Sequence, residues 1–142
     1  MSDVLSQLEA ERAVRDTIVM MHHAVDDEDW PSVRAYLNAD FQLNGITPPI
    51  RGADTVLTFM RDLAAQSAGS KFQHILGNMT VTVSVDEAEA TALQTVYRYR
   101  ADELSSPLSK SGSRVAYRLK REYGAWKIVS FSIVRLWMEG EL

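Results

Sequence analysis

The sequence predicts an α+β fold in which helices pack on one face of a curved antiparallel sheet. Apolar residues recur at helical spacing in the first half of the chain. From residue 71 onward, four long stretches alternate between apolar and polar residues, as strands do. Helices grouped before strands are typical of α+β proteins. With 142 residues, of which 46% are hydrophobic, we expect one domain over residues 1–142.

Three helices are predicted in the first half. The first, over residues 4–26, carries one apolar stripe at spacings of four, three and four: Val14, Ile18, Met21 and Val25. The four acids at 26–29 then disfavour continuation, because the helix dipole opposes negative charge at a C-terminus. Asp29 is the expected N-cap of a second short helix that runs to about residue 37. A third helix is expected to start at 51–54 and to end at 67–70.

The strands follow from alternation and from turn residues. A short strand is predicted at 41–46, ended by the proline pair at 48–49. Four long strands are predicted at 71–85, 88–101, 113–123 and 126–138, with the clearest hairpin turn at Tyr123-Gly124 and the longest loop at 101–112. Long strands twist and curl, so this sheet is expected to form a cone that encloses a cavity.

Composition excludes several classes of function. There are no cysteines, which rules out thiol catalysis, disulfides and zinc–thiolate sites. Fifteen Lys and Arg against nineteen Asp and Glu give a net charge of −4, so no nucleic-acid partner is expected. No apolar run approaches the length of a membrane span, and the N-terminus has no secretory pattern. A cytoplasmic protein that binds neither nucleic acid nor membrane is therefore expected.

Six short motifs carry a resemblance to a known family. They are DDEDW at 26–30, DF at 40–41, GADTV at 52–56, QHILGN at 73–78, GAWKI at 124–128 and WMEG at 137–140. With this order of elements, residues 8–140 resemble the SnoaL-like branch of the nuclear transport factor 2-like fold. The resemblance implies a cone with the element order α-α-β-α-β-β-β-β. That superfamily holds dehydratases, isomerases, dehydrochlorinases, cyclases, hydrolases and proteins without activity.

The resemblance also implies a catalytic pair. Scytalone dehydratases, bile-acid dehydratases and hexachlorocyclohexane dehydrochlorinases share a His–Asp pair in the cone, and by motif the pair here is His74 and Asp26. An imidazole can take up and return a proton near neutral pH. A carboxylate on one ring nitrogen orients the ring and leaves the other nitrogen as the base. These residues imply a lyase or isomerase that needs no cofactor or metal and acts on a small, mostly apolar cyclic or polyketide-like substrate.

A general base contributes about 10²–10⁴-fold to a rate, so other groups must polarise the substrate. The resembling dehydratases use tyrosines, whereas this chain has Val25 beside Asp26. By alternation, Arg135 is expected to interrupt an apolar face of the last strand, where it needs a partner. The candidate substrate-binding residues are Tyr97, Tyr99, Tyr117, Asn44, Trp137, Arg135, His22 and Met20.

Two other interpretations remain open. A binding or assembly module, resembling the small subunits of ring-hydroxylating dioxygenases, predicts no His–Asp contact and an apolar outer sheet face. Proton transfer by a carboxylate, as in steroid isomerases, fits less well, because Asp86 lies in a predicted turn and Asp102 in a predicted loop. Under each interpretation a homo-oligomer, dimer or trimer, is expected, because open sheet faces in this superfamily are usually buried between subunits.

Overall fold

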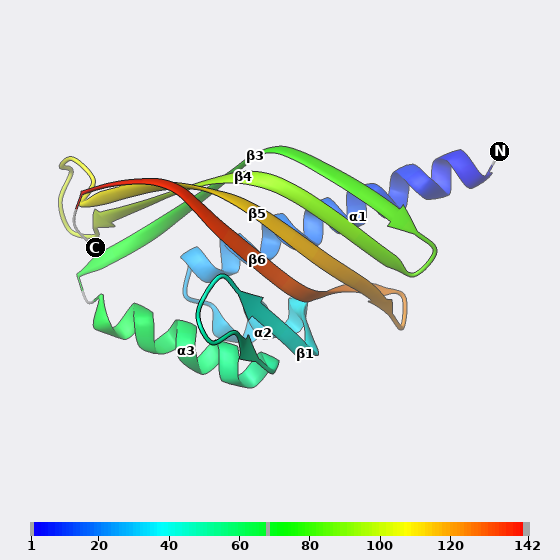
Figure 1. Ribbon diagram of the computed structural model, residues 1–142, viewed down its shortest axis with the longest axis horizontal. Helices are drawn as coiled ribbons and strands as arrows, with labels where there is room; N and C mark the ends of the chain where they lie inside the picture. The colour runs from blue at the N-terminus through cyan, green and yellow to red at the C-terminus, as the bar shows by residue number, and fades with distance from the viewer. Residues whose placement is uncertain (1, 68, 141–142) are drawn as a thin grey trace.

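The computed structural model describes residues 2–67 and 69–140, which form three helices and six strands (Figure 1). In chain order they are α1 (Ser2–Asp26), α2 (Trp30–Tyr36), β1 (Leu37–Asn44), β2 (Ile50–Arg51), α3 (Ala53–Gln66), β3 (Ser70–Ser84), β4 (Glu87–Arg100), β5 (Ser109–Glu122) and β6 (Ala125–Gly140). The predicted α+β class is confirmed, and the elements follow the predicted order except for the additional short strand β2 before α3. In these residues, no helix combines the length and the apolar character needed to span a membrane.

The described strands form a single mixed sheet in the order β2-β1-β6-β5-β4-β3. Strands β3 to β6 make the expected antiparallel meander. Strand β1, however, pairs in parallel with β6, so the sheet is not antiparallel throughout. The chain passes through α3 to the far edge of the sheet and enters β3 running against β1. The successive reversals of the meander then return β6 in the same direction as β1.

Two boundaries differ from the sequence prediction. The chain resumes pairing directly after the prolines, because β2 pairs with Gln42 and Leu43 of β1. The loop before β5 is shorter than expected and covers residues 101–108. Residues 109–112 pair with β4 on one side and with β6 on the other, so they belong to the sheet. The predicted turn at Tyr123-Gly124 is confirmed, with φ of 51° and 82°.

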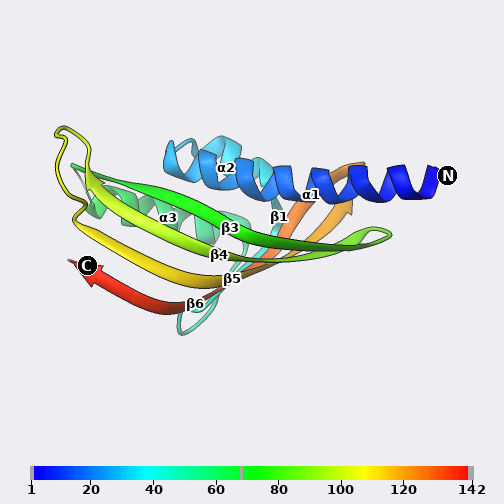
Figure 2. The same cartoon turned by 90° about the horizontal axis from the view of Figure 1, so that it is seen from above.

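One face of the sheet, which we call the inner face, packs against the helices. α1 and α3 lie on the concave side of the curved sheet (Figures 1 and 2). From these helices Val14, Ile18 and Val56 are completely buried. On β4 and β5 the inner face consists of alternating buried residues: Ala88, Ala90, Ala92, Val115, Tyr117 and Leu119. We call the opposite, convex side of the sheet the outer face.

Helix α1 runs beside the edge strand β3. The guanidinium of Arg15 donates to the carbonyl of Met79 at 3.2 Å. At the other end of the contact, Lys71 pairs with Glu28 just after α1, with 2.5 Å between Nζ and Oε2. An open strand edge presents backbone groups that can pair with another chain, and a helix laid along it covers them. This docking also brings the last turn of α1 to the first part of β3.

Candidate active site

The last turn of α1 places Asp26 against His74 on β3. Nδ1 of His74 lies 2.5 Å from Oδ1 of Asp26, so the expected contact between the two side chains is present. The backbone N–H of His74 donates to Oδ2 of the same carboxylate at 2.9 Å. Because β3 is an edge strand, this N–H is free to bond a side chain. One carboxylate therefore holds both the backbone and the ring of His74.

This contact determines which ring nitrogen can act as a base. An ionised carboxylate only accepts hydrogen bonds, so the hydrogen of a neutral His74 ring lies on Nδ1. Nε2 then carries the lone pair that can accept a proton. The side chains of His74 and Asp26 are only 17% and 20% exposed, which strengthens the hydrogen bond between them. The arrangement is that of a base and the carboxylate that orients it.

The acids that follow Asp26 have other partners. Glu28 binds Lys71 on β3. Asp29 caps α2, because its Oδ1 accepts from the backbone N–H of Ser32 at 3.3 Å. The sequence already distinguished Asp26, which its motif assigns to the pair with His74, from Asp29, the expected N-cap of the second helix. In the structure, Asp26 is the last residue of α1, whereas Glu28 and Asp29 follow the helix and so reach different partners.

A second imidazole lies beside the first. His22, one helical turn before Asp26, is 6% exposed, and its ring centroid lies 5.3 Å from that of His74. Nε2 of His22 is 2.6 Å from the hydroxyl oxygen of Tyr117 on β5. The ring of Phe131 stacks on Tyr117 and meets His22 edge-on. Two of the predicted substrate-binding residues, His22 and Tyr117, are thus brought to the His–Asp pair.

Burial keeps this second pair neutral. Desolvation, followed by the nearby charges of His74 and His23, lowers the pKa of His22 from 6.5 to about 3. Burial also raises the pKa of Tyr117 well above its ordinary value. The hydrogen bond between them therefore joins two uncharged groups at neutral pH. Among the described residues, Nδ1 of His22 has no hydrogen-bond partner.

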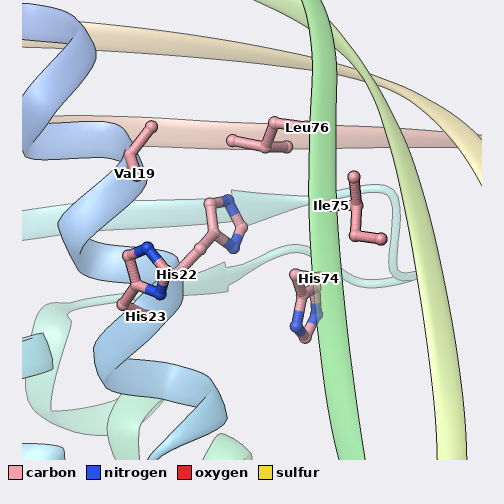
Figure 3. A pocket seen from close by; sticks show the side chains of 6 residues that line it. All are labelled: Val19, His22, His23, His74, Ile75 and Leu76. Atoms are coloured by element: carbon pink, nitrogen blue, oxygen red, sulfur yellow. The ribbon is translucent and has the colours of Figure 1, made fainter.

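A pocket of about 240 Å³ opens between α1 and β3 beside the pair. The residues that line it are Val19, His22, His23, His74, Ile75 and Leu76, although the side chain of Ile75 lies on the side of β3 away from α1 (Figure 3). All three histidines of the chain therefore line one pocket. Figure 3 shows the ring of His22 in the space between α1 and β3, and His74 on the strand. Within residues 2–67 and 69–140, no cluster of three His, Cys, Asp or Glu side chains could hold a metal ion.

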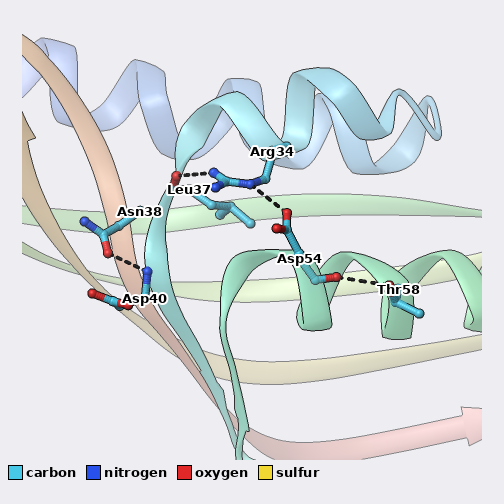
Figure 4. A network of polar contacts seen from close by, with 6 residues as sticks. All are labelled: Arg34, Leu37, Asn38, Asp40, Asp54 and Thr58. Carbon is cyan, nitrogen blue, oxygen red and sulfur yellow. Dashed lines mark hydrogen bonds and ion pairs between the residues drawn. The ribbon is translucent and has the colours of Figure 1, made fainter.

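A polar network holds the elements that follow the acidic run in place (Figure 4). The guanidinium of Arg34 on α2 donates to Asp54 on α3 and to the carbonyl of Leu37, both at 3.0 Å. On β1, the Asn38 side chain accepts from the backbone N–H of Asp40 at 2.8 Å. These bonds tie α2, α3 and the start of β1 together.

Four of the predicted substrate-binding residues lie away from the pocket. Tyr97 and Tyr99 alternate with the buried alanines of β4, so they project from the outer face. Asn44 pairs with Ser132 on that same face, and its amide donates to the Ser132 hydroxyl at 3.2 Å. Met20 is 48% exposed on α1. The expectation that these residues line the pocket is not met.

Two more predicted substrate-binding residues, Trp137 and Arg135, lie on β6 next to a β-bulge. The register of β5 and β6 shifts between the pairs Ser113–Arg135 and Gly112–Trp137, which leaves Leu136 as an extra residue. Trp137 therefore lies over Gly112, on the outer face. Arg135 remains opposite Ser113, but its side chain is exposed. Strict alternation along β6 predicted one shared face for Arg135 and Trp137, and the bulge makes that prediction wrong.

Sequence reasoning missed three buried polar residues on the inner face: Gln94, Ser111 and Ser113. Gln94 and Ser113 are each 4% exposed and Ser111 is 9% exposed. The alternation of residues along β4 already indicated that Gln94 faces inward. The inward alanines of β4 stand at 88, 90 and 92, and Gln94 occupies the next inward position. His23, at the pocket rim, was also not among the predicted site residues.

The family follows from a match that covers most of the chain. The family model of the SnoaL-like domain matches residues 6–132. The chain belongs to the SnoaL-like family. The resemblance inferred from the short motifs is therefore confirmed. No curated protein matches the sequence.

Solved structures share the fold of this SnoaL-like domain. A candidate scytalone dehydratase from Novosphingobium aromaticivorans has a TM-score of 0.84 at 14% identity, over 100% of this chain and 93% of that one. Aln2 from a Streptomyces species has a TM-score of 0.77 at 21% identity, over 90% of each chain. A nuclear transport factor 2-like protein with a cystatin-like fold from N. aromaticivorans has a TM-score of 0.77 at 21% identity, over 95% of this chain and 87% of that one. These similarities establish the cone fold.

Proposed function

We propose that this SnoaL-like protein is a cofactor-independent lyase or isomerase in which His74 is the general base and Asp26 orients it. The observation that carries the proposal is the double hold of one carboxylate on His74, at the backbone N–H and at Nδ1, beside a pocket. This hold leaves Nε2 as the proton acceptor. The fold shared with a candidate scytalone dehydratase supports the reaction class.

The chemistry needs only a proton transfer. Nε2 of His74 takes a proton from a carbon next to a carbonyl or next to a leaving group, and Asp26 stabilises the imidazolium that forms. In a lyase, the electron pair of the broken C–H bond forms a double bond, and the leaving group departs with its own bonding pair. His74 then gives its proton to the departing hydroxide or to solvent. In an isomerase, it returns the proton to another carbon.

The pocket lining supports a small, mostly apolar substrate. Val19 and Leu76 supply aliphatic surface, and the lining includes no carboxylate or ammonium group. A volume of about 240 Å³ is small compared with the roughly 300–1,000 Å³ of typical small-molecule sites. A compact cyclic or polyketide-like molecule fits these properties. The alternative of a non-catalytic module predicted that the His–Asp contact would be absent, whereas the contact is present.

We also propose that the protein self-associates through the outer face of the sheet. Ile75, Leu93, Val134 and Trp137 are 42–62% exposed there, and we call them the outer patch. They share the outer face across four strands: Arg114 lies between Leu93 and Val134, and Thr95 and Gly112 lie between Ile75 and Trp137. Exposed apolar clusters on a sheet face favour burial against another protein surface.

Proton abstraction can be measured before the substrate is known. The test is the exchange of α-hydrogens of a cyclic ketone, 1-tetralone, in D₂O, followed by NMR. In Asp26→Asn, the amide oxygen can still accept from the backbone, but the amide NH₂ faces Nδ1 and moves the ring hydrogen to Nε2. We expect the exchange rate to fall by about 10²–10⁴-fold in Asp26→Asn and in His74→Gln.

The exposed neighbour offers a matched control. Asp27→Asn removes the same charge one residue further along and should leave the exchange rate unchanged. The melting temperature of each variant shows whether the fold is intact. Exchange that persists in both folded site variants would reject His74 as the base.

A further inference from the structure

Gln94, Ser111 and Ser113 form a polar cluster on the inner face. All three are buried, and Gln94 pairs directly with Ser113 in the ladder between β4 and β5. None of the three side chains hydrogen-bonds to another described residue, and Oε1 of Gln94 is a fully buried acceptor without a donor. Proteins rarely retain such groups, because a buried polar group without a hydrogen-bond partner destabilises the fold. A retained cluster of this kind is typical of a ligand-binding surface.

The cluster lies next to the proposed base. His74 pairs with Val96 on β4, and Gln94 is two residues before Val96 on the same face. Such diagonal neighbours are about 7–8 Å apart. Gln94 also pairs with Leu76, which lines the pocket. Gln94 is therefore one strand, and Ser111 and Ser113 are two strands, further into the cone than His74.

The chemistry of the cluster selects the group that it can bind. Oε1 of Gln94 accepts a hydrogen bond and needs a donor, whereas serine hydroxyls can donate or accept. None of the three side chains is charged. Arg135, the cation opposite Ser113, directs its guanidinium toward Met138, with 3.5 Å between Nη1 and Sδ. A neutral hydroxyl group, which donates and accepts at once, matches these requirements.

We propose that Gln94, Ser111 and Ser113 bind a hydroxyl group of a neutral substrate while the reacting carbon of that substrate faces His74. This inference rests on the proposed function and makes it specific, because it restricts the substrate class to hydroxylated cyclic compounds. It also assigns Gln94 as a determinant of specificity. A site built to pair with a hydroxyl rejects an analogue that lacks one, since its buried polar groups then stay unpaired.

Two ligands of equal shape test the inference by binding alone. 2-Naphthol and 2-methylnaphthalene differ by a hydroxyl in place of a methyl group, and their fluorescence reports binding. The wild-type protein should bind 2-naphthol about tenfold more tightly. Gln94→Leu should lose this preference and bind the methyl compound at least as well. Gln73→Leu makes the same change on the outer face of the neighbouring strand and should keep the preference.

Thermal melting without ligand supplies a second readout. Gln94→Leu removes an unpaired buried polar group, so it should melt at a higher temperature than the wild type, whereas a structural role for Gln94 predicts a lower one. Ser113→Ala should weaken 2-naphthol binding several-fold without unfolding the protein. Equal affinity of the wild type for the two probes, or no binding of either, overturns the inference.

The outcome is separable from that of the proposed function. His74→Gln should retain the preference for 2-naphthol, because the cluster is intact. A lost preference in Gln94→Leu with no dependence of proton exchange on His74 would uphold the subsite and reject the base. The reverse pattern would uphold the base and reject the subsite.

Discussion

Burial of His22 couples the stability of the protein to pH. Its pKa is lowered from 6.5 to about 3 in the folded protein, whereas the unfolded ring is protonated below about pH 6.5. Between these values the unfolded state binds more protons, so the free energy of unfolding falls as the pH decreases from 6.5 toward 3. The expected slope is up to about 1.4 kcal/mol per pH unit. Urea unfolding at a series of pH values from 7 to 4 measures it.

Replacement of the imidazole isolates this contribution. His22→Gln keeps a side chain that can bond to Tyr117 but does not titrate. Below pH 6.5 we expect the dependence of the free energy of unfolding on pH to lose the contribution of about one bound proton. His23→Gln, on the exposed side of the same helix turn, should keep the wild-type slope. Identical slopes in the wild type and His22→Gln would show that His22 is not the group responsible.

Individual residues differ in how far the sequence predicts them. Asp26 and His74 are carried by local motifs at a helix end and on one strand, so the sequence names both, and the fold brings them together. Tyr97 was misplaced although the alanines of β4 already show which positions face inward. Gln94 was missed because a buried glutamine has no motif. Only its position in the alternation and its lack of partners distinguish it.

At the scale of elements, periodicity predicts helices and strands well, but it predicts the wrong face for side chains that follow a β-bulge. The helical stripe of α1 and the turn at Tyr123-Gly124 are local, so the sequence contains them in full. The bulge near Leu136 depends on how β6 pairs with β5, and nothing in β6 alone marks it. One extra residue reverses the face of every side chain that follows, which is how Trp137 reached the outer face.

The same bulge explains why residue 112 is a glycine, because it places Trp137 directly over this position. A Cβ at Gly112 would lie 2.1 Å from Nε1 of Trp137, so any larger residue must displace the indole. We expect Gly112→Ala to destabilise the protein by about 1–3 kcal/mol and to change the tryptophan emission. In Trp137→Ala the same glycine substitution should cost little. Additive effects of the two substitutions in chemical unfolding would contradict this packing.

At the scale of the whole molecule, the unpredicted feature is the parallel pairing of β1 with β6. These strands are separated by α3 and the entire meander, and their direction depends on which edge of the sheet the chain enters after α3. No local pattern contains that choice. The length of the strands predicted a curled sheet that forms a cone, and the family resemblance implied the same shape.

Substitution in the outer patch tests whether the whole molecule self-associates through this face. Val134 is 62% exposed between Leu93 and Trp137, and a lysine there would place a charge inside any interface built on this face. Because burial of a charge without a partner is costly, we expect Val134→Lys to shift the protein from an oligomer to a monomer in light scattering after size-exclusion chromatography. Leu104→Lys, in the exposed loop before β5, makes a similar substitution elsewhere and should leave the oligomer intact. A wild-type chain that elutes as a monomer would show that this face is not a contact between subunits. An oligomer that survives Val134→Lys would show the same, because an apolar patch buried between subunits cannot accept a lone ammonium group.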